Sequence, residues 1–409
     1  MKNSFKLMLV IFLLASFFIK LFFILKFSST LTLSSDDLNY LKSAVYLIKK
    51  GVLTYQEFIE PTVFIMPLYP LFCALLIKLS GNIAAGILAI RVVQALFATA
   101  TVLIIFMLAK HYFDVRTAFI SAFLMSIYMP NITSAGFILT ETLFAFLLCL
   151  LIYLSVSARG KPSLIRLCSI AFIWAAAVMC RPTIAFYPVF LVLYWYLNGT
   201  YKIKDLVKPC IILSSVFIIL MSAWWIRNYV EYGMFIPLSA SGGNPMLQGT
   251  YPNYRQIPSN TTVYKLGRNA LETDKIENDV AKKRIIDGFK KNFAGYLGWY
   301  TIGKTKFFWC SPFYWRTYGF VSLKFVFAVH YVLILGLFYL IILSFKDIKK
   351  YVLILSVILY FNVVHCVYMA FDRYAFPLMP LLCVFSAYLI SMMYDYIKGR
   401  NKNTIVVVD

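Results

Sequence analysis

Long apolar runs recur along this chain, and they constrain its fold more than any other feature. The first, FKLMLVIFLLASFFIKLFFILKF, occupies residues 5–27. A run of about 20 such residues is long enough to cross a bilayer core as a helix. Of the 409 residues, 61% are hydrophobic and 14% are charged, whereas soluble proteins are about half apolar and about a quarter charged. The sequence therefore predicts an all-α polytopic membrane protein.

We expect about ten membrane-spanning helices. Their ranges are 6–27, 84–109, 117–135, 138–157, 164–180, 183–198, 208–227, 320–344, 351–369 and 376–396. The first range has a basic start and a long apolar core. These features favour an uncleaved span over a cleaved signal peptide, whose apolar core would be shorter.

The net charge of +22 comes largely from basic residues in the short connections between these segments. We place the following clusters in the cytoplasm: Lys2 and Lys6; Lys110 and Arg116; Arg159, Lys161 and Arg166; Lys202, Lys204 and Lys208; Lys346, Lys349 and Lys350; Lys398, Arg400 and Lys402. They fall on every second connection, as the positive-inside rule predicts. Both termini are then cytoplasmic in a plasma or inner membrane. The positive charge is explained by its role in orienting the helices in the membrane, so we expect no nucleic-acid partner.

Two long segments are expected on the outer side, 28–83 and 228–319. They divide the chain into an N-terminal membrane module (1–227), an extracytoplasmic region (228–319) and C-terminal membrane helices (320–409). Within the first segment, 63–81 is apolar but carries Pro67, Pro70 and Lys78. We interpret it as a juxtamembrane helix. A full crossing is the alternative, and it would move every later basic loop to the outside.

The second outer segment contains DKIENDVAKKRIIDGFKKNF, residues 274–293. Apolar residues recur in it at near-helical spacing: Ile276, Val280, Ile286, Phe289 and Phe293. The pattern predicts an amphipathic helix that rests on lipid headgroups. The positive-inside rule applies to short loops, so the lysines of this helix in a long outer loop do not conflict with the topology.

Motif searches exclude several classes of site. GWYTIGKT, residues 298–305, matches the letters of a P-loop, but it lacks the preceding buried strand that such a loop requires. The three histidines, His111, His330 and His365, are far apart, which gives little support to a histidine metal site or a Ser-His-Asp triad. The eight cysteines are scattered, and all but Cys310 lie in apolar stretches, so no disulfide framework is indicated.

Ionisable residues are expected to gather on the outer face. They are Asp36 and Asp37 after the first span, and Glu141, Arg181, Arg227 and Arg373 at the ends of later spans. Each taken alone could simply mark the membrane interface. Acids and arginines together on one face indicate a site for a phosphorylated substrate.

Six stretches of the chain carry a resemblance to a known family. They are DDLNYLKSAVYLIKKG, EPTVFIMPLYPLFCALL, LTETLFAFLL, CRPT, WWIRNYVEYGMFIPLSASGGN and DRYAFPLMP, in that order. Together they resemble the GT-C-fold glycosyltransferases related to protein O-mannosyltransferases, lipid A aminoarabinose transferases and rhizobial lipopolysaccharide core transferases. The usual D-E of the first motif is D-D here, and the usual H-P-P-L is MPLY. Because of these two departures, the resemblance does not specify the donor sugar or the acceptor.

The resemblance implies a GT-C fold and a transferase that uses a polyprenyl-phosphate sugar as donor on the outer face. The acceptor would be an envelope glycan, lipid or protein. The implied catalytic residues are Asp36, Asp37 and Glu141, and the implied substrate-binding residues are Tyr40, Arg181, Arg227, Arg373 and Tyr374. No cofactor is certain, and a divalent cation held by Asp36 and Glu141 is left open.

The chemistry of the residues agrees with this reading. One carboxylate, Asp36, suffices as the base for a single inverting displacement. Arginines stabilise the charge that develops on the departing phosphate. Asp37 has three possible roles: it orients the acceptor, binds a cation or caps the following helix. We expect Arg373 and Arg227 to act on the phosphate rather than in folding.

Three other functions are considered. A transporter or flippase of lipid-linked sugars would show repeats and broken helices at the midplane, whereas the charges here gather on one face. A polymerase or ligase would use a diphosphate-linked donor, and the adjacent aspartates argue against it. In a structural membrane protein the outer acids would be dispensable.

Overall fold

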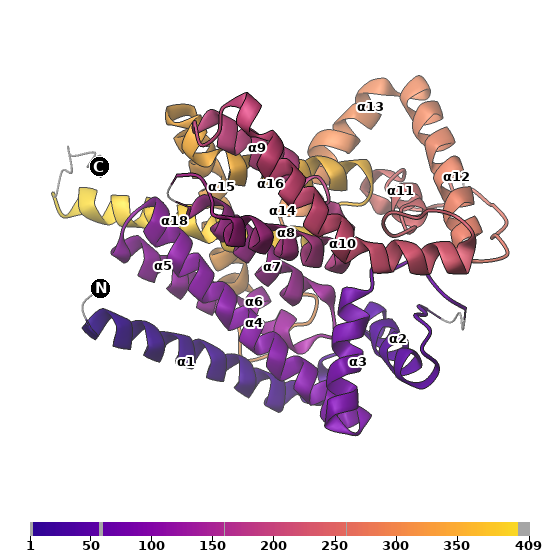
Figure 1. Cartoon of the computed structure of the whole chain (residues 1–409), viewed down its shortest axis with the longest axis horizontal. Coiled ribbons are helices and arrows are strands. Elements are labelled where there is room, and N and C mark those ends of the chain that lie inside the picture. Colours follow the sequence, from indigo (N-terminus) through magenta and orange to yellow (C-terminus); the bar gives the residue numbers. More distant parts are fainter. Residues whose placement is uncertain (1–2, 57–59, 159, 259, 400–409) are drawn as a thin grey trace.

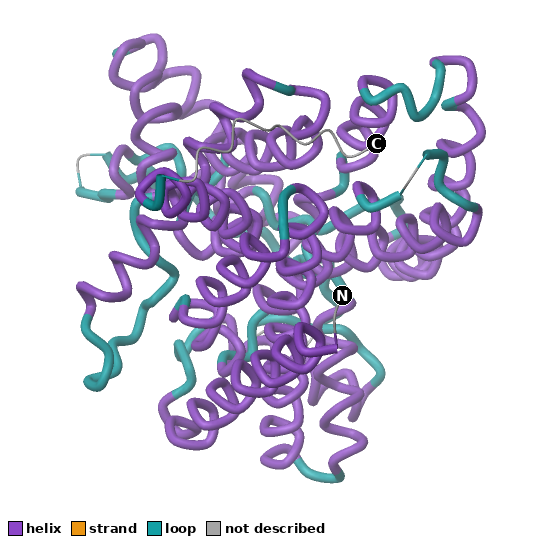
Figure 2. The backbone as a smooth tube through the Cα atoms, turned by 90° about the vertical axis from the view of Figure 1, so that its left-hand side faces the viewer, coloured by secondary structure: helices purple, strands orange, loops and turns teal. Residues whose placement is uncertain are grey.

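A computed structural model describes residues 3–56, 60–158, 160–258 and 260–399. Regular secondary structure in this part of the chain is helical, with loops and turns between the helices (Figure 2). Within these described residues, six segments are long and apolar enough to cross a membrane. They contain α1 (Asn3–Phe27), α4 (Ile83–Tyr112), α10 (Val207–Tyr232), α15 (Leu323–Lys346), α16 (Ile348–Val367) and α18 (Met379–Ile397). The protein is therefore a multi-pass membrane protein.

The four remaining expected spans are shorter or bent. They correspond to α5 (Val115–Ile127) with α6 (Met129–Thr133), α7 (Thr140–Val156), α8 (Leu164–Cys180) and α9 (Tyr187–Leu197). The segment expected to span at 117–135 is broken, because the chain bends by 65° between α5 and the α6 segment. Tyr128 is extended at this break, and Pro130 follows in the first turn of α6. Proline cannot continue the hydrogen-bond ladder of the preceding helix.

Shorter helices connect these segments. They are α2 (Asp36–Lys50), α3 (Leu68–Ser80), α11 (Gly243–Gln248), α12 (Ala270–Lys291), α13 (Phe293–Gly298), α14 (Lys304–Trp309) and α17 (Asp372–Ala375), with 3₁₀ or π turns at 28–30, 134–136, 182–184, 203–205, 252–254, 299–303 and 376–378. In Figure 1 the start of α1 and the end of α18 lie at the left, and α2, α11 and α12 lie at the right. The two expected outer segments thus share one end of the helix bundle.

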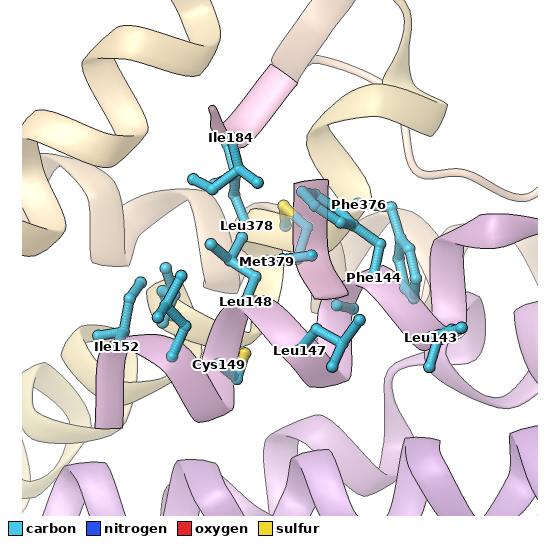
Figure 3. Packing of buried hydrophobic residues seen from close by; sticks show 14 of the residues in the cluster. Leu143, Phe144, Leu147, Leu148, Cys149, Ile152, Ile184, Phe376, Leu378 and Met379 are labelled. Carbon is cyan, nitrogen blue, oxygen red and sulfur yellow. The ribbon is translucent and has the colours of Figure 1, made fainter. Parts of the chain in front are cut away.

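A common core fixes the helix ends that later form the site. Figure 3 shows Leu143, Phe144, Leu147 and Leu148 of α7 packed near Ile184 and near Phe376, Leu378 and Met379. Ile184 follows the end of α8, and the 376–378 turn follows α17. The start of α7, the end of α8 and the whole of α17 are therefore held by the same apolar contacts.

Close packing of α15 on α18 supports this arrangement. A Cβ atom at Gly336 would lie 2.3 Å from the carbonyl oxygen of Leu382, so only glycine permits this approach. The Ser386 hydroxyl donates to the carbonyl of Val332 at 2.8 Å. The turn that carries α17 into α18 is thereby anchored to the bundle.

The helix expected near residues 274–293 is present as α12, and it packs on α11. Its buried side chains are Glu277 and Ala281, together with the backbone at Gly288. Ile286 and Phe293 are 54% and 64% exposed. Ile286 in α12 and Phe293 at the start of α13 are exposed apolar side chains, and the contact of this region with lipid headgroups stays a prediction.

Helix α3 has 13 residues, and at 1.5 Å per residue it is about 20 Å long, shorter than a bilayer core of about 30 Å. Length alone does not decide whether α3 crosses, since α9 is shorter. A crossing here would move every later basic loop to the outside, so we expect that α3 does not cross the membrane. Cysteine introduced at Lys78 should react with an impermeant maleimide added from the outer side, in a background with the exposed Cys310 replaced by serine. Cysteine at Lys346 is the control for the cytoplasmic side. Labelling at residue 78 only from the cytoplasm would refute this topology.

Candidate active site

Four of the predicted site residues meet in one cluster, which we call the acid–arginine cluster: Asp36, Glu141, Arg181 and Arg373. Each stands at a helix end. Asp36 and Glu141 lie in the first turns of α2 and α7, Arg181 follows the last residue of α8, and Arg373 lies in α17. The backbone of Arg181 is extended, since Pro182 disfavours helical geometry in the residue before it. This ends α8 where its arginine can turn toward α7.

Glu141 joins the two arginines. Its Oε1 accepts hydrogen bonds from Nη2 of Arg181 at 2.6 Å and from Nε of Arg373. Arg181 also donates from Nε to the Thr140 hydroxyl at 2.8 Å. Glu141 is fully buried. A buried carboxylate between two guanidinium groups fixes both of them, because separating it from either would leave an unpaired charge in an apolar environment.

Arg373 connects this pair to Asp36. Its Nη1 donates to Asp36 Oδ2 at 2.6 Å, and the arginine is only 7% exposed. Within the described residues, Nη2 of Arg373 and Nη1 of Arg181 donate to no protein acceptor. The cluster therefore keeps guanidinium donors for a ligand, in the fork geometry that suits phosphate.

Asp36 is the most accessible acid of the cluster, with a side chain 42% exposed. Its Oδ1 accepts a hydrogen bond from the Tyr55 hydroxyl at 3.0 Å. Because a carboxylate oxygen has two lone pairs, each oxygen can still accept a hydrogen bond from a ligand. Asp36 can thus contact a ligand and Arg373 together.

Asp37 does not belong to the cluster. Its carboxylate accepts from the Thr32 hydroxyl at 2.5 Å, from Leu33 N at 2.9 Å and from Ser35 N at 3.0 Å. Successive helix residues point about 100° apart, so Asp37 faces the preceding loop while Asp36 faces the arginines. Asp37 is 3% exposed, and it accepts from the residues before α2 rather than from N–H groups of α2, so it holds the preceding loop against the start of the helix.

We expect Asp37→Ala to destabilise the protein by about 1–3 kcal/mol, because two backbone N–H groups and a hydroxyl lose a charged acceptor. Thermal unfolding of the purified protein would measure the change. Asp279→Ala is the control, since Asp279 is exposed on α12 and pairs only with Lys282 at 3.7 Å. An unfolding midpoint equal to that of Asp279→Ala would contradict the structural role.

Tyrosine rings border the cluster. The Tyr40 ring lies 5.3 Å from that of Tyr55 and 5.0 Å from that of Tyr69. Burial raises the pKa of Tyr40 well above its usual value, so its hydroxyl stays protonated and able to donate. Tyr374 stacks on His365 at 4.7 Å, and the Arg181 guanidinium lies 5.7 Å from the Tyr374 ring.

Arg227 lies apart from these residues. Its Nη1 donates to the Thr62 carbonyl at 2.8 Å and to the Asn228 side chain at 3.0 Å. Thr62 N in turn donates to the Leu53 carbonyl at 2.9 Å. Arg227 thus ties α10 to the segment that precedes α3, and the structure does not bring it to the acid–arginine cluster.

Part of the chain matches one protein family. Residues 62–226 match the family model described as dolichyl-phosphate-mannose-protein mannosyltransferase. The matched range includes Glu141 and Arg181 but neither Asp36 nor Arg373. No curated protein matches the chain by sequence.

Solved structures match over nearly the whole chain. ArnT from Cupriavidus metallidurans, bound to undecaprenyl phosphate, is 13% identical with a TM-score of 0.54, and the match covers 98% of this chain and 62% of that one. The apo oligosaccharyltransferase from Archaeoglobus fulgidus is 12% identical with a TM-score of 0.56, covering 96% of this chain and 51% of that one.

The chain has the GT-C glycosyltransferase fold. It spans less than two thirds of the length of either of these two proteins. The predicted fold class is confirmed.

A divalent cation does not fit between the two acids of the acid–arginine cluster in this arrangement. Within the described residues, no three His, Cys, Asp or Glu side chains come together as a metal site. Asp36 and Glu141 each place an oxygen on Arg373, so this guanidinium occupies the position that a cation between the two acids would need.

The P-loop-like stretch has another role. Residues 299–303 form a π turn, and Lys304 begins α14. The Lys304 ammonium donates to the carbonyls of Cys366 and Tyr368 at 2.8 and 2.9 Å and lies 3.8 Å from the Tyr300 ring centre. Burial lowers the pKa of Lys304 to about 7. This lysine ties the outer region to the end of α16 rather than reaching toward a nucleotide.

Four residues at this site, Tyr55, Thr140, Trp315 and Asp372, were not predicted from the sequence. Tyr55 binds Asp36, and Thr140 binds Arg181. Trp315 donates to Asp372 at 3.1 Å, and its ring lies 5.9 Å from the Arg373 guanidinium. Thr140 and Asp372 directly precede predicted site residues, so adjacency was an available signal. Tyr55 and Trp315 lie in loops without a periodic pattern.

Proposed function

We propose that this protein is a membrane glycosyltransferase that moves a sugar from a polyprenyl-phosphate donor to an envelope glycan, lipid or protein. The observation that carries the proposal is the acid–arginine cluster, in which a buried glutamate holds two arginines with open donors beside the accessible Asp36. Support also comes from ArnT, which was crystallised with undecaprenyl phosphate, and from the Archaeoglobus oligosaccharyltransferase, which was solved with an inhibitory peptide and dolichol phosphate.

In this proposal Arg181 and Arg373 bind the donor phosphate. Glu141 positions both guanidinium groups before the donor arrives, so little reorganisation is needed when charge develops on the leaving phosphate. Glu141 is then a positioning residue, because both arginines occupy its Oε1. The open Nη groups of the arginines supply the hydrogen bonds to phosphate oxygens.

Asp36 acts as the base. It takes the proton of the acceptor hydroxyl while the acceptor oxygen attacks the anomeric carbon, and the bond from that carbon to the phosphate oxygen breaks with its electron pair. The departing polyprenyl phosphate needs no general acid, because phosphate is a good leaving group. One displacement inverts the anomeric configuration. Tyr40 and Tyr374 border the place where the sugar would lie.

We assign the reaction to the extracytoplasmic face, with both termini in the cytoplasm. The basic clusters support this orientation, and α2 and α12 lie at the end of the bundle opposite the start of α1 (Figure 1). The charged cluster stands at helix ends rather than at the middle of the bundle. That position favours an enzyme over a transporter, whose site would lie near the membrane midplane.

Mass spectrometry of envelope glycolipids and glycoproteins, with and without the gene, tests the function. We expect one class of molecule to lose a single sugar residue, and we expect the wild-type gene but not Asp36→Asn to restore it. Equal restoration by Asp36→Asn, expressed at the wild-type level, would contradict the proposal.

A further inference from the structure

A cavity of about 720 Å³ lies at the opposite end of α8 from the acid–arginine cluster. Its lining includes Lys161, Pro162 and Leu164 around the start of α8 and Tyr201, Lys204 and Lys208 near the start of α10. Arg181 follows the last residue of the 17-residue α8, so the cavity and the cluster are about 25 Å apart along this helix. The cavity is therefore not part of the site described above.

An apolar groove continues from this cavity along α10. A second hollow of about 540 Å³ shares Val207 and Ile211 with the first and extends past Ser214 to Ile218. Val207, Ile211, Ser214 and Ile218 recur at three- and four-residue spacing on α10, so they form one stripe on the helix, and Ile203 lies in the turn before it. From Val207 to Ile218 the stripe is about 17 Å long. Its length and apolar lining suit a hydrocarbon chain.

The charge of the cavity is positive. Lys161 lies 3.6 Å from Asp205, which balances one lysine. Lys204 and Lys208 form no ion pair within the described residues. The N-terminal ends of α8 and α10 also lie here, and helix N-termini attract anions. The hollow thus combines two unpaired ammonium groups with an apolar extension.

We propose that this cavity binds an anionic glycerophospholipid, with its phosphodiester headgroup at Lys204 and Lys208 and one acyl chain in the groove along α10. A basic pocket between membrane helices that opens on an apolar groove matches both ends of such a lipid. The proposal is independent of the catalytic function. The bound lipid would brace α8 against α10, two helices that pack closely on each other.

Native mass spectrometry of the purified full-length protein, titrated with phosphatidylglycerol or phosphatidylcholine, tests the headgroup. We expect preferential retention of phosphatidylglycerol. The double variant Lys204→Gln, Lys208→Gln should weaken it by roughly 30-fold, since each lysine near an anionic lipid contributes about fivefold. The matched control is Lys346→Gln, Lys349→Gln, which removes the same charge from exposed residues at the end of α15 and the start of α16. Equal affinity in the two double variants would overturn the proposal.

The acyl-chain position needs its own variant. Ser214→Trp should fill the groove without changing charge and lower the affinity for phosphatidylglycerol, while Ile219→Trp, at an exposed position outside the groove, should not. Equal affinities would overturn the placement of the chain. Titration with polyprenyl phosphate distinguishes the other anionic lipid. Tighter retention of polyprenyl phosphate than of phosphatidylglycerol, lost on Lys204→Gln, Lys208→Gln, would also overturn the proposal.

Discussion

Asp36→Asn should lower the rate of sugar transfer by a factor of roughly 10²–10⁴, the range that a general base contributes. The amide keeps the shape of the side chain and an oxygen that can accept from Tyr55 or Arg373, but it cannot take a proton from the acceptor. The Asp36 side chain is 42% exposed, so we expect little loss of stability. Turnover by the purified variant, with a polyprenyl-phosphate sugar as donor, measures the effect.

Two control variants distinguish the loss of the base from the loss of any carboxylate or of folded protein. Asp279→Asn removes an exposed carboxylate from α12 and should keep the wild-type rate. Asp37→Asn lies one residue away but faces the 32–35 loop, so any loss of activity should follow its loss of folded protein. Wild-type turnover by Asp36→Asn would exclude this residue as the base.

Arg373→Lys should slow transfer by roughly 10²–10³, the cost of losing one donor to a developing charge. Lysine keeps the charge but loses the planar fork, and one ammonium cannot reproduce the bonds to both Asp36 and Glu141. Arg373 is also buried, so we expect the variant to be less stable. Breaking a buried ion pair outright costs about 3–5 kcal/mol, and Arg373→Gln should approach that value. Turnover and thermal unfolding measure the two effects separately.

Arg227→Lys is the matched control for this experiment. Arg227 donates to one carbonyl and one side-chain oxygen, and an ammonium group can serve both. We expect its transfer rate to stay within about fivefold of wild type, since lysine keeps the positive charge and can donate to the same two oxygens. If Arg227→Lys were slower than Arg373→Lys, the phosphate site would have to be moved toward α10.

The sequence predicted the helices well because length and hydropathy set them. The expected span at 84–109 is α4, Ile83–Tyr112, and the expected span at 351–369 is α16, Ile348–Val367. The bend at Tyr128 was missed, since a proline near a helix end and a proline that breaks a span look alike in sequence. The juxtamembrane placement of 63–81 stays a prediction, because α3 is no shorter than α5 or α9.

The site was less predictable than the helices. The predicted topology placed Asp36, Glu141, Arg181 and Arg373 on the same outer face of the membrane. It does not specify which of their side chains are in contact. Asp36 faces the arginines and Asp37 faces the preceding loop because of the turn at Ser35 and the hydrogen bond from Thr32. No periodic pattern in the sequence marks Ser35 or Thr32. The role expected for Arg373 stays a prediction, and the structure adds that its guanidinium is buried and paired with Asp36 and Glu141.

The proposal that the acid–arginine cluster binds the donor phosphate is tested most directly by photo-crosslinking. The probe is a polyprenyl phosphate with a photoreactive group on the isoprene unit beside the phosphate, added to the purified wild-type protein. We predict crosslinked peptides that contain Glu141, Arg181 or Arg373, and we predict their loss when unlabelled polyprenyl phosphate competes. Competed crosslinks confined to the start of α8 and α10, with none at these three residues, would contradict the proposed site.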